Sequence, residues 1–383
     1  MEREVVFNEL DDLLNRICVK LQLNKTRRER VENSYKALCE FINSSEGYFS
    51  KYDRIDFYPQ GSYRIQTTVK PKGKDEFDLD FILEIKGEWT TEDPMKLLKE
   101  LYKLFRDSGI YRDKVELKNR CVRINYENDF HIDILPSFSA KASLNNTNIK
   151  VPDRELRDWT DSNPKGYGDW FNEKANLVDR VLLEKRFSAS IEELPRDKPY
   201  ELINPLNKVV QLIKRYRDIY YKDKESNGVR SIIITTLCAE FYDGDASEYA
   251  SIAKIINSIS EHISNSSKIL EVYNPVNPNE KFSEKWDIDK EEYNEFCDFI
   301  LGFKKIWFEM VALNGVPEKI KKLEELFGES IVKDSLREQA EYVKSLRENK
   351  SLKISTINGA LILNRINNCG SYKSIESHTF YGE

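Results

Sequence analysis

The sequence is poor in the residues that build disulfide frameworks and zinc sites. It holds six cysteines and only three histidines in 383 residues. Small disulfide-rich domains and zinc modules carry closely spaced cysteine or Cys/His pairs. The cysteines here are scattered, with no short pairing, at Cys18, Cys39, Cys121, Cys238, Cys297 and Cys369. Neither a disulfide framework nor a zinc site is therefore expected.

Long apolar runs and an excess of positive charge are also missing. The opening residues lack the basic-then-apolar order of a secretory signal, and the apolar stretch around Ile232–Phe241 is too short to span a bilayer. The chain has 60 basic and 66 acidic residues and a formal net charge of −6, which gives no general attraction to polyanions. We expect a cytoplasmic protein with no membrane partner.

What remains is the composition of an ordinary folded protein that is too long for one core. Hydrophobic residues make up 40% of the chain and aromatic residues 11%, as is usual for globular proteins. A chain of 383 residues exceeds what a single hydrophobic core usually supports. Two lobes, with a cleft between them, are the natural expectation.

The two halves of the chain differ in hydrophobic periodicity. Helical spacing predicts helices near 7–23 and from Thr26, where Thr26–Glu29 has the form of a capping box. Strand patterns occupy 56–137, with a helix over 94–106, and 115–126 and 130–135 are interpreted as a strand pair across the turn at 127–129. Further helical patterns lie near 168–187, 205–222, 231–243, 248–264, 289–312 and 316–348.

These patterns predict an α+β fold. A mixed sheet with helices is expected in the first lobe, residues 1–160, which includes the N-terminal helices. A helical lobe, residues 161–383, follows. The segment 265–287, rich in Asn, Ser, Pro and Lys, is interpreted as a long surface connection rather than a linker between domains.

Two aspartates stand out in the strand Phe77–Leu83. Asp78 and Asp80 are two residues apart, so on a strand they project from the same face with Cα atoms roughly 6–7 Å apart. Two carboxylates so placed repel each other unless cations lie between them. A solvated strand face would explain the pair if it stood alone.

A third aspartate makes the set more specific. Asp133 lies between apolar neighbours on a later predicted strand and can supply a third carboxylate ligand. Two Mg²⁺ ions held by such acids can bind the attacking and leaving oxygens of an in-line phosphoryl displacement, and Mn²⁺ can substitute. Asp133 would also take the proton of the acceptor hydroxyl. Gly61 and Ser62, on the turn before the first pair, can approach and bind a triphosphate.

This ordered set resembles the Gly-Ser, Asp-x-Asp and distal Asp signature of polymerase-β-like nucleotidyltransferases. The stretches that carry it are Gln60–Arg64, Thr67–Val69, Asp78–Asp80 and His131–Pro136. In detail they look like the bacterial CD-NTases, the cGAS/DncV-like enzymes of CBASS anti-phage signalling. The resemblance implies a nucleotidyltransferase lobe over 1–160 and a helical lobe over 161–383 that closes over the nucleotide.

The resemblance also implies nucleotide contacts beyond the carboxylates. Val209–Arg215 and Ser231–Leu237 look like the family's helices in which a lysine and a serine contact donor phosphates, which places Lys214 and Ser231 in that role. Gln60 joins them through the Gly-Ser turn. The alternatives are an exposed helix lysine for Lys214 and a helix N-cap for Ser231.

The resulting hypothesis is a cytoplasmic cyclic oligonucleotide synthase that joins ATP and a second NTP with release of pyrophosphate. The alternatives are a linear oligoadenylate synthase, transfer to an RNA or small-molecule acceptor, or a catalytically silent nucleotide or RNA sensor. The resemblance implies CBASS regulatory or effector partners, for which the tail 378–383 is the expected attachment point. An RNA activator could bind at Lys25, Arg27, Arg28 and Arg30, although a solvated helix start also explains that cluster.

Overall fold

The computed structural model describes residues 9–70, 77–126, 130–140, 147–178, 203–224, 226, 228–313, 315–349, 352–355, 361–362 and 372–374. The chain divides into two compact units. We call residues 23–172 and 271–284 the sheet unit, and residues 1–22, 173–270 and 285–383 the helical unit.

A mixed seven-stranded sheet is the centre of the sheet unit as described. Its order is β1-β2-β5-β4-β3, with β6 paired to β5 and β7 to β6. The central pair β2–β5 is parallel, and the other neighbours are antiparallel. The strands are β1 Ile55–Pro59, β2 Phe77–Ile85, β3 Val115–Leu117, β4 Val122–Tyr126, β5 Phe130–Ser139, β6 Ile149–Asp153 and β7 Asp158–Ser162.

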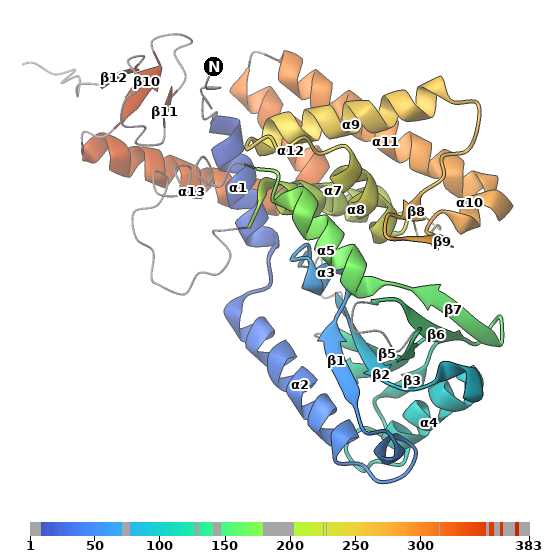
Figure 1. Ribbon diagram of the computed structural model, residues 1–383. Helices are drawn as coiled ribbons and strands as arrows, with labels where there is room; N and C mark the ends of the chain where they lie inside the picture. Colours follow the sequence, from blue (N-terminus) through green and yellow to red (C-terminus); the bar gives the residue numbers. More distant parts are fainter. Residues whose placement is uncertain are drawn as a thin grey trace, which may run out of the picture. The chain divides into compact units, whose positions relative to one another are not determined.

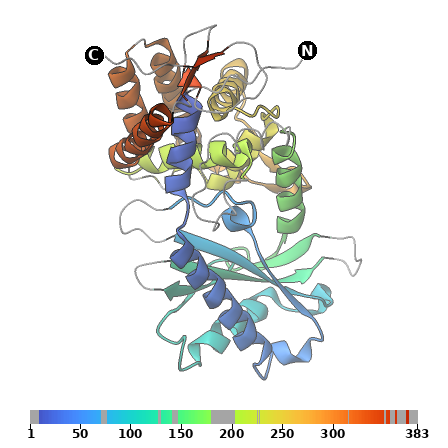
Figure 2. The same ribbon diagram turned by 90° about the vertical axis from the view of Figure 1, so that its left-hand side faces the viewer.

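Helices α2 (Lys25–Asn43) and α4 (Pro94–Arg106) cover one face of this sheet, and Figure 2 shows α2 running across the strands. Alternate residues of β2, such as Leu79 and Leu83, are fully buried against this helix layer. Because strand side chains alternate between faces, the residues between them point to the opposite face. The sheet unit also contains η1 Phe49–Lys51, α3 Gly61–Arg64, η2 Trp89–Thr91, the start of α5 Pro164–Ala175, β8 Tyr273–Asn274 and β9 Asn277–Lys281.

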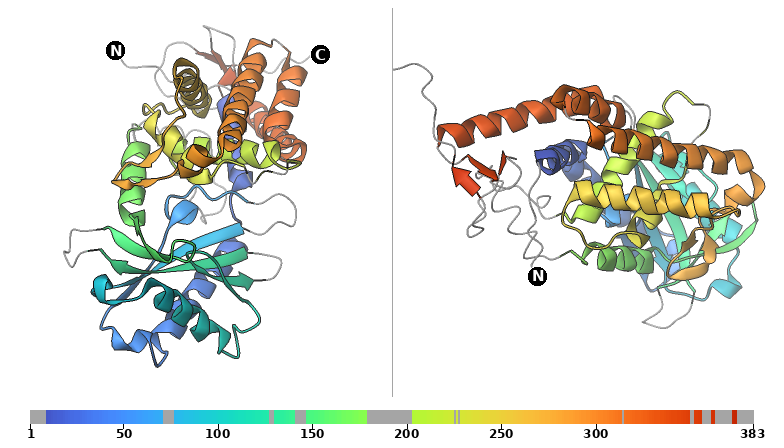
Figure 3. Two further views of the ribbon diagram at one scale, coloured as in Figure 1. Left: turned by 90° about the vertical axis from the view of Figure 1, so that its right-hand side faces the viewer. Right: turned by 90° about the horizontal axis from the view of Figure 1, so that it is seen from above.

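The helical unit is built around long packed helices. α11 lies along α9, and α1 packs against α13, as can be followed in Figures 1 and 3. Large side chains of α11, including Phe299, Phe303 and Trp307, are fully buried in its core. Its elements are α1 Glu9–Leu21, α7 Pro205–Tyr220, α8 Ser231–Glu240, α9 Glu248–Asn265, α10 Glu284–Ile288, α11 Lys290–Ala312, α12 Val316–Phe327, α13 Glu329–Glu348, β10 Lys353–Ser355, β11 Leu361–Ile362 and β12 Tyr372–Ser374.

The predicted fold class is confirmed: a mixed sheet with helices comes first and a mainly helical region follows. The helix α4 has its predicted bounds, because the Asp93 side chain accepts hydrogen bonds from the amides of Met95 and Lys96 and Pro94 occupies the first turn. In the described part of the chain, no helix is both long and apolar enough to cross a membrane.

Several local predictions were wrong. The helix α2 begins at Lys25 with Asn24 as its N-cap, which accepts from the Arg27 amide at 2.8 Å, so Thr26 does not cap it. The segment 115–126 forms two strands rather than one. The pattern over 316–348 is two helices, separated at Gly328, whose φ of +97° ends α12. The segment 265–287, interpreted as a surface connection, was not predicted to hold strands and contains a short hairpin, β8–β9.

The two compact units divide the chain differently from the predicted lobes 1–160 and 161–383. The first helix, α1, packs on α7, α9 and α13 and so belongs to the helical unit. The hairpin β8–β9 returns to the sheet unit, where it packs on β7 and Ser162 Oγ donates to Glu280 Oε1 at 3.2 Å. The unit to which α1 or the β8–β9 hairpin belongs depends on tertiary packing. Hydrophobic periodicity along the chain does not contain that information.

Candidate active site

Three predicted carboxylates lie together on the polar face of the sheet. Asp78 and Asp80 are on β2, and Asp133 is on its parallel neighbour β5. The strand register places Asp80 directly beside Asp133 and Asp78 beside His131. Neighbouring strands are about 4.8 Å apart, and residues in register share a face. The three acids therefore form one negatively charged patch, in which the side chain of Asp78 is 59% exposed and that of Asp133 only 11% exposed.

An arginine that the sequence reasoning missed holds two of these acids. Arg123 lies on β4, directly opposite Asp133. Its Nε donates to Asp133 Oδ1 at 2.7 Å and its Nη2 to Asp133 Oδ2 at 2.8 Å, which is a bidentate charge-assisted pair. The same Nη2 lies 3.1 Å from Asp78 Oδ1. The hydrogen bonds to Asp133 raise the pKa of Arg123 above its ordinary value, so this side chain stays positively charged.

The sequence did contain a signal for this contact. A three-residue turn at 127–129 between two strands puts Tyr126 opposite Phe130, as the structure has it. Counting back from that pair places Arg123 opposite Asp133. The residues of the turn itself lie outside the described part of the chain.

The predicted Gly-Ser turn lies directly against Asp80. The Gln60 amide donates to the Asp80 carbonyl oxygen at 2.9 Å, which ties the turn to β2. Gly61 follows with φ of +58°, and a Cβ at this position would lie 2.8 Å from Asp80 Oδ2. Glycine is required here both by the left-handed backbone and by the approach of the carboxylate.

Ser62 stands next in the four-residue helix α3. Its hydroxyl oxygen accepts from Thr68 Oγ1 at 3.2 Å, and its carbonyl oxygen accepts from the Thr67 amide at 2.8 Å. The end of α3 is held by Arg64, whose Nη2 donates to Asp169 Oδ1 of α5 at 3.1 Å. The sheet unit thus fixes Gln60, Gly61 and Ser62 beside the acids from both sides of the turn.

One more titratable group borders the acids. Cys121 precedes β4 and is 8% exposed. Burial raises the pKa of its thiol well above the ordinary value, and the negative charges of Asp133 and Asp80 raise it further. Without a bound cation the thiol is therefore protonated. The three acids of the patch offer carboxylate oxygens as donors.

The chemistry of these donors suits a hard divalent cation such as Mg²⁺. In the described ranges, no group of three or more His, Cys, Asp and Glu side chains is gathered as a metal site. Two of the three acids are bound instead by Arg123. The residues that would hold a metal ion are Asp78, Asp80 and Asp133.

The other two predicted nucleotide contacts lie in the helical unit. Lys214 is on α7 and is 7% exposed, so the alternative of an exposed helix lysine was wrong. The helix α8 begins at Ser231 with Arg230 as its N-cap residue, so Ser231 is not the N-cap. Arg217 Nε donates to the Val229 carbonyl at 2.7 Å and so links α7 to the turn before α8. Their contact with a nucleotide stays a prediction.

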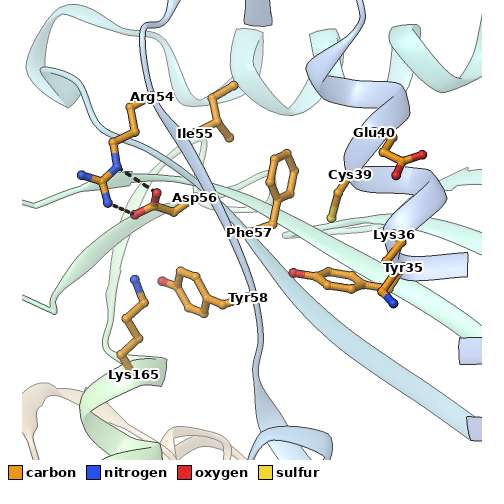
Figure 4. Close-up of a pocket in the computed structure, with 10 residues that line it drawn as sticks. All are labelled: Tyr35, Lys36, Cys39, Glu40, Arg54, Ile55, Asp56, Phe57, Tyr58 and Lys165. Carbon is orange, nitrogen blue, oxygen red and sulfur yellow. Dashed lines mark hydrogen bonds and ion pairs between the residues drawn. The ribbon is translucent and has the colours of Figure 1, made fainter. Parts of the chain in front are cut away.

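A hollow of about 580 Å³ lies along the outer edge of β1 in the sheet unit (Figure 4). The carboxylates of the patch do not line it. Arg54 pairs with Asp56 within the lining at 3.0 Å, and Lys165 pairs with the buried Glu84, which lies outside the lining, at 3.1 Å. The residues that line it are Tyr35, Lys36, Cys39, Glu40, Arg54, Ile55, Asp56, Phe57, Tyr58 and Lys165.

Comparison with known proteins identifies the family. Residues 9–175 match the SMODS family, described as "Second Messenger Oligonucleotide or Dinucleotide Synthetase domain". A c-di-GMP synthase of Roseivirga ehrenbergii is 36% identical over 344 residues, which cover 89% of this chain and 90% of that protein.

Solved structures show the same fold. The Bradyrhizobium diazoefficiens CD-NTase CdnG, in complex with GTP, superposes with a TM-score of 0.70 at 22% identity and covers 86% of this chain and 98% of its own. An E. coli CdnC in complex with HORMA has a TM-score of 0.60 at 14% identity and covers 85% of this chain and 98% of its own. From the match over most of its length to a cyclic dinucleotide synthase, we conclude that this chain belongs to the CD-NTase family of second messenger oligonucleotide or dinucleotide synthetases and is a cyclic dinucleotide synthase.

Proposed function

We propose that this protein makes cyclic di-GMP from two molecules of GTP and releases two molecules of pyrophosphate. In each of two transfers, a ribose hydroxyl of one nucleotide attacks the α-phosphorus of the other, and the bond to pyrophosphate breaks. The 36% identical c-di-GMP synthase supports this product, and it changes our expectation of ATP plus a second NTP. The observation that carries the proposal is the set of three carboxylates brought into register on β2 and β5.

Asp78 and Asp80 would hold two Mg²⁺ ions, and Asp133 would share one of them. When bound, such ions neutralise the triphosphate and lower the pKa of the attacking hydroxyl. Asp133 accepts the hydroxyl proton in this proposal, because it is the acid most enclosed by protein. The rigid parallel pair β2–β5 supplies the positioning on which phosphoryl transfer depends.

The remaining predicted residues would bind the triphosphate. Gly61 has no side chain to keep phosphate away from the backbone, and the Ser62 hydroxyl can donate to a phosphate oxygen. Gln60 shapes the same turn through its bond to Asp80. Lys214 supplies a positive charge and Ser231 a hydroxyl in the first turn of α8. The anti-phage role and a regulatory partner at 378–383, which lie outside the described residues, stay predictions.

The test is synthesis from defined nucleotides. The purified protein is incubated with each radiolabelled NTP alone and with mixtures, with Mg²⁺ or Mn²⁺, and the products are treated with phosphatase and separated. We expect a phosphatase-resistant product from GTP alone that requires the metal ion. The double variant Asp78→Asn/Asp80→Asn should form none while keeping its circular dichroism, because removal of mutually repelling charges does not unfold the sheet.

Asp107→Asn is the matched control, because this exposed aspartate stands at the C-terminal end of α4, which covers the face of the sheet opposite the acids. It should keep full activity. A product that requires ATP together with GTP would contradict cyclic di-GMP. Phosphatase-sensitive products only would indicate linear transfer, and nucleotide binding without any product would indicate a silent sensor.

A further inference from the structure

One row of side chains crosses the sheet through the candidate active site. Glu116 on β3 is in register with Arg123 on β4, Arg123 with Asp133 on β5, and Asp133 with Asp80 on β2. Residues in register share a face of the sheet. Arg123 therefore stands between two acids of different environment: the enclosed Asp133 and the half-exposed Glu116.

In the structure the guanidinium is on the active-site side of this row. It occupies both oxygens of Asp133, at 2.7 and 2.8 Å, and reaches Asp78 Oδ1 at 3.1 Å. These oxygens are the same ones that a metal ion would need under the proposed function. Glu116, on the other side, is bound by Asn125 Nδ2 at 2.8 Å and Lys118 Nζ at 2.5 Å.

We propose that Arg123 competes with the catalytic metal ion for Asp78 and Asp133, and that metal loading requires the guanidinium to turn away toward Glu116. This inference rests on the proposed function, because it assumes that the three acids bind the metal. A guanidinium and a divalent cation on the same carboxylates repel each other strongly in a partly enclosed site. Arg123 is thus a positioning residue. Its positive charge neutralises the negative charges of Asp78 and Asp133, and it opposes premature binding of the metal ion.

The pair between Arg123 and Asp133 stabilises the protein when no metal ion is bound. Asp133 is 11% exposed on its side chain, and an unpaired carboxylate at that burial is costly. The bidentate pair removes this cost when no metal is bound. The same pair lowers the affinity for the metal by the free energy needed to break it.

The direct test is the affinity of the intact protein for Mn²⁺ without nucleotide, measured by electron paramagnetic resonance of the free ion and by calorimetry. Arg123→Gln should bind Mn²⁺ roughly tenfold more tightly than the wild type, because a positive charge near the metal is removed. It should also turn over GTP more slowly, because Asp133 loses its orientation. A merely structural role for Arg123 would instead weaken metal binding.

Arg120→Gln is the matched control. Arg120 lies three residues away and forms a pair of similar length, 2.6 Å, with the buried Asp153. Its loss should leave Mn²⁺ affinity unchanged. Arg123→Lys keeps the charge without the fork, so it should bind Mn²⁺ more tightly than the wild type but less tightly than Arg123→Gln, and an affinity no higher than that of the wild type would overturn the competition if Arg123→Gln does not fold.

Glu116 is tested by a double-mutant cycle. Glu116→Gln should weaken Mn²⁺ binding by a few-fold in the wild-type background and have no effect in Arg123→Gln. An equal effect in both backgrounds would overturn the part assigned to Glu116. Equal or weaker Mn²⁺ binding by Arg123→Gln would overturn the competition. Absence of Mn²⁺ binding in both the wild type and Arg123→Gln would refute the metal site of the proposed function itself.

Discussion

Gly61 combines a left-handed backbone conformation with a close approach to the proposed metal ligand Asp80. Gly61→Ala introduces a Cβ 2.8 Å from Asp80 Oδ2 at a φ of +58°. The left-handed backbone costs about 1 kcal/mol for alanine, and the carboxylate must shift away. We expect GTP turnover to fall at least tenfold, since sub-ångström misplacement of a metal ligand is costly. Activity assays and urea denaturation would measure the two effects separately.

Gly47→Ala is the control that separates the effect of backbone strain from the effect of a new Cβ contact with Asp80. Gly47 also has a positive φ, +108°, but no atom lies within 4 Å of the position a Cβ would take. This variant should lose stability and keep its turnover number. If Gly61→Ala stayed as active as Gly47→Ala, the close approach of Gly61 to Asp80 would not contribute to GTP turnover.

At the scale of single residues, sequence predicted the acids better than their surroundings. Asp78, Asp80 and Asp133 could be found because their spacing along strands is a local pattern. The contact of Arg123 with Asp133 follows from the register of the β4–β5 hairpin, whereas its contact with Asp78 is non-local, because it depends on β2 pairing with β5. Lys214 shows the same limit, since its burial is decided by packing within the helical unit and not by its neighbours in sequence.

Among the elements, α5 is anchored to the sheet by a buried charge. Lys165, in its first turn, binds Glu84 of β2 at 3.1 Å, and Lys86 and Ser139 bind the same carboxylate. Burial alone would raise the pKa of Glu84, but the hydrogen bonds from Lys86, Ser139 and Lys165 outweigh it and hold that pKa below its ordinary value. This carboxylate therefore stabilises the fold only when ionised.

Glu84→Gln should lower the free energy of unfolding by about 2 kcal/mol at pH 7, as loss of charge-assisted hydrogen bonds does. Because the folded-state pKa is depressed, the stabilisation is fully present above the ordinary value of 4.5 and is lost as the pH falls below it. The difference between wild type and variant should thus shrink in acid. Urea denaturation at pH 7, 5 and 3.5 measures it.

The control for this titration is Glu329→Gln, which removes an exposed pair with Lys333 on α13. An exposed i,i+4 pair contributes little, so its loss should change stability very little at any of the three pH values. A Glu84→Gln difference that stayed constant down to pH 3.5 would contradict the role of the ionised carboxylate.

The type of most elements followed from local pattern, whereas their partners did not. The alternation in β2 and the Asp93-Pro94 start of α4 gave those elements correctly. The parallel pairing of β2 with β5 joins residues about fifty apart in the chain, and no local signal specifies it. The start of α2 was misplaced because Thr26–Glu29 and Asn24 offer competing caps, and the structure uses Asn24.

At the scale of the whole molecule, each unit has residues from distant parts of the chain. The helical unit takes α1 from the N-terminal region, and the sheet unit takes the β8–β9 hairpin from 271–284. Length and periodicity predicted two lobes, and the limits of the two compact units depend on these exchanges. Separate cores of this size are expected to unfold as separate cooperative transitions.

Separate unfolding transitions allow a test of which unit binds the metal ion and which binds the triphosphate. All three proposed metal ligands, Asp78, Asp80 and Asp133, lie in the sheet unit, whereas Lys214 and Ser231 lie in the helical unit. Mn²⁺ alone should therefore raise the melting temperature of the sheet unit only. Binding at 100 times the dissociation constant adds about 2.7 kcal/mol to stability, which is a shift of several degrees for a unit of this size.

Mn²⁺ together with a non-hydrolysable GTP analogue should raise both transitions, because the proposed phosphate contacts draw on both units. Calorimetry gives the transitions, and hydrogen exchange followed by mass spectrometry assigns each to its peptides. Lys214→Met should abolish the added shift of the helical unit and preserve the Mn²⁺ shift of the sheet unit. If the analogue stabilised only the sheet unit in the wild type, Lys214 and Ser231 would have no part in binding the triphosphate, and the nucleotide would depend on Gln60, Gly61, Ser62 and the acids alone.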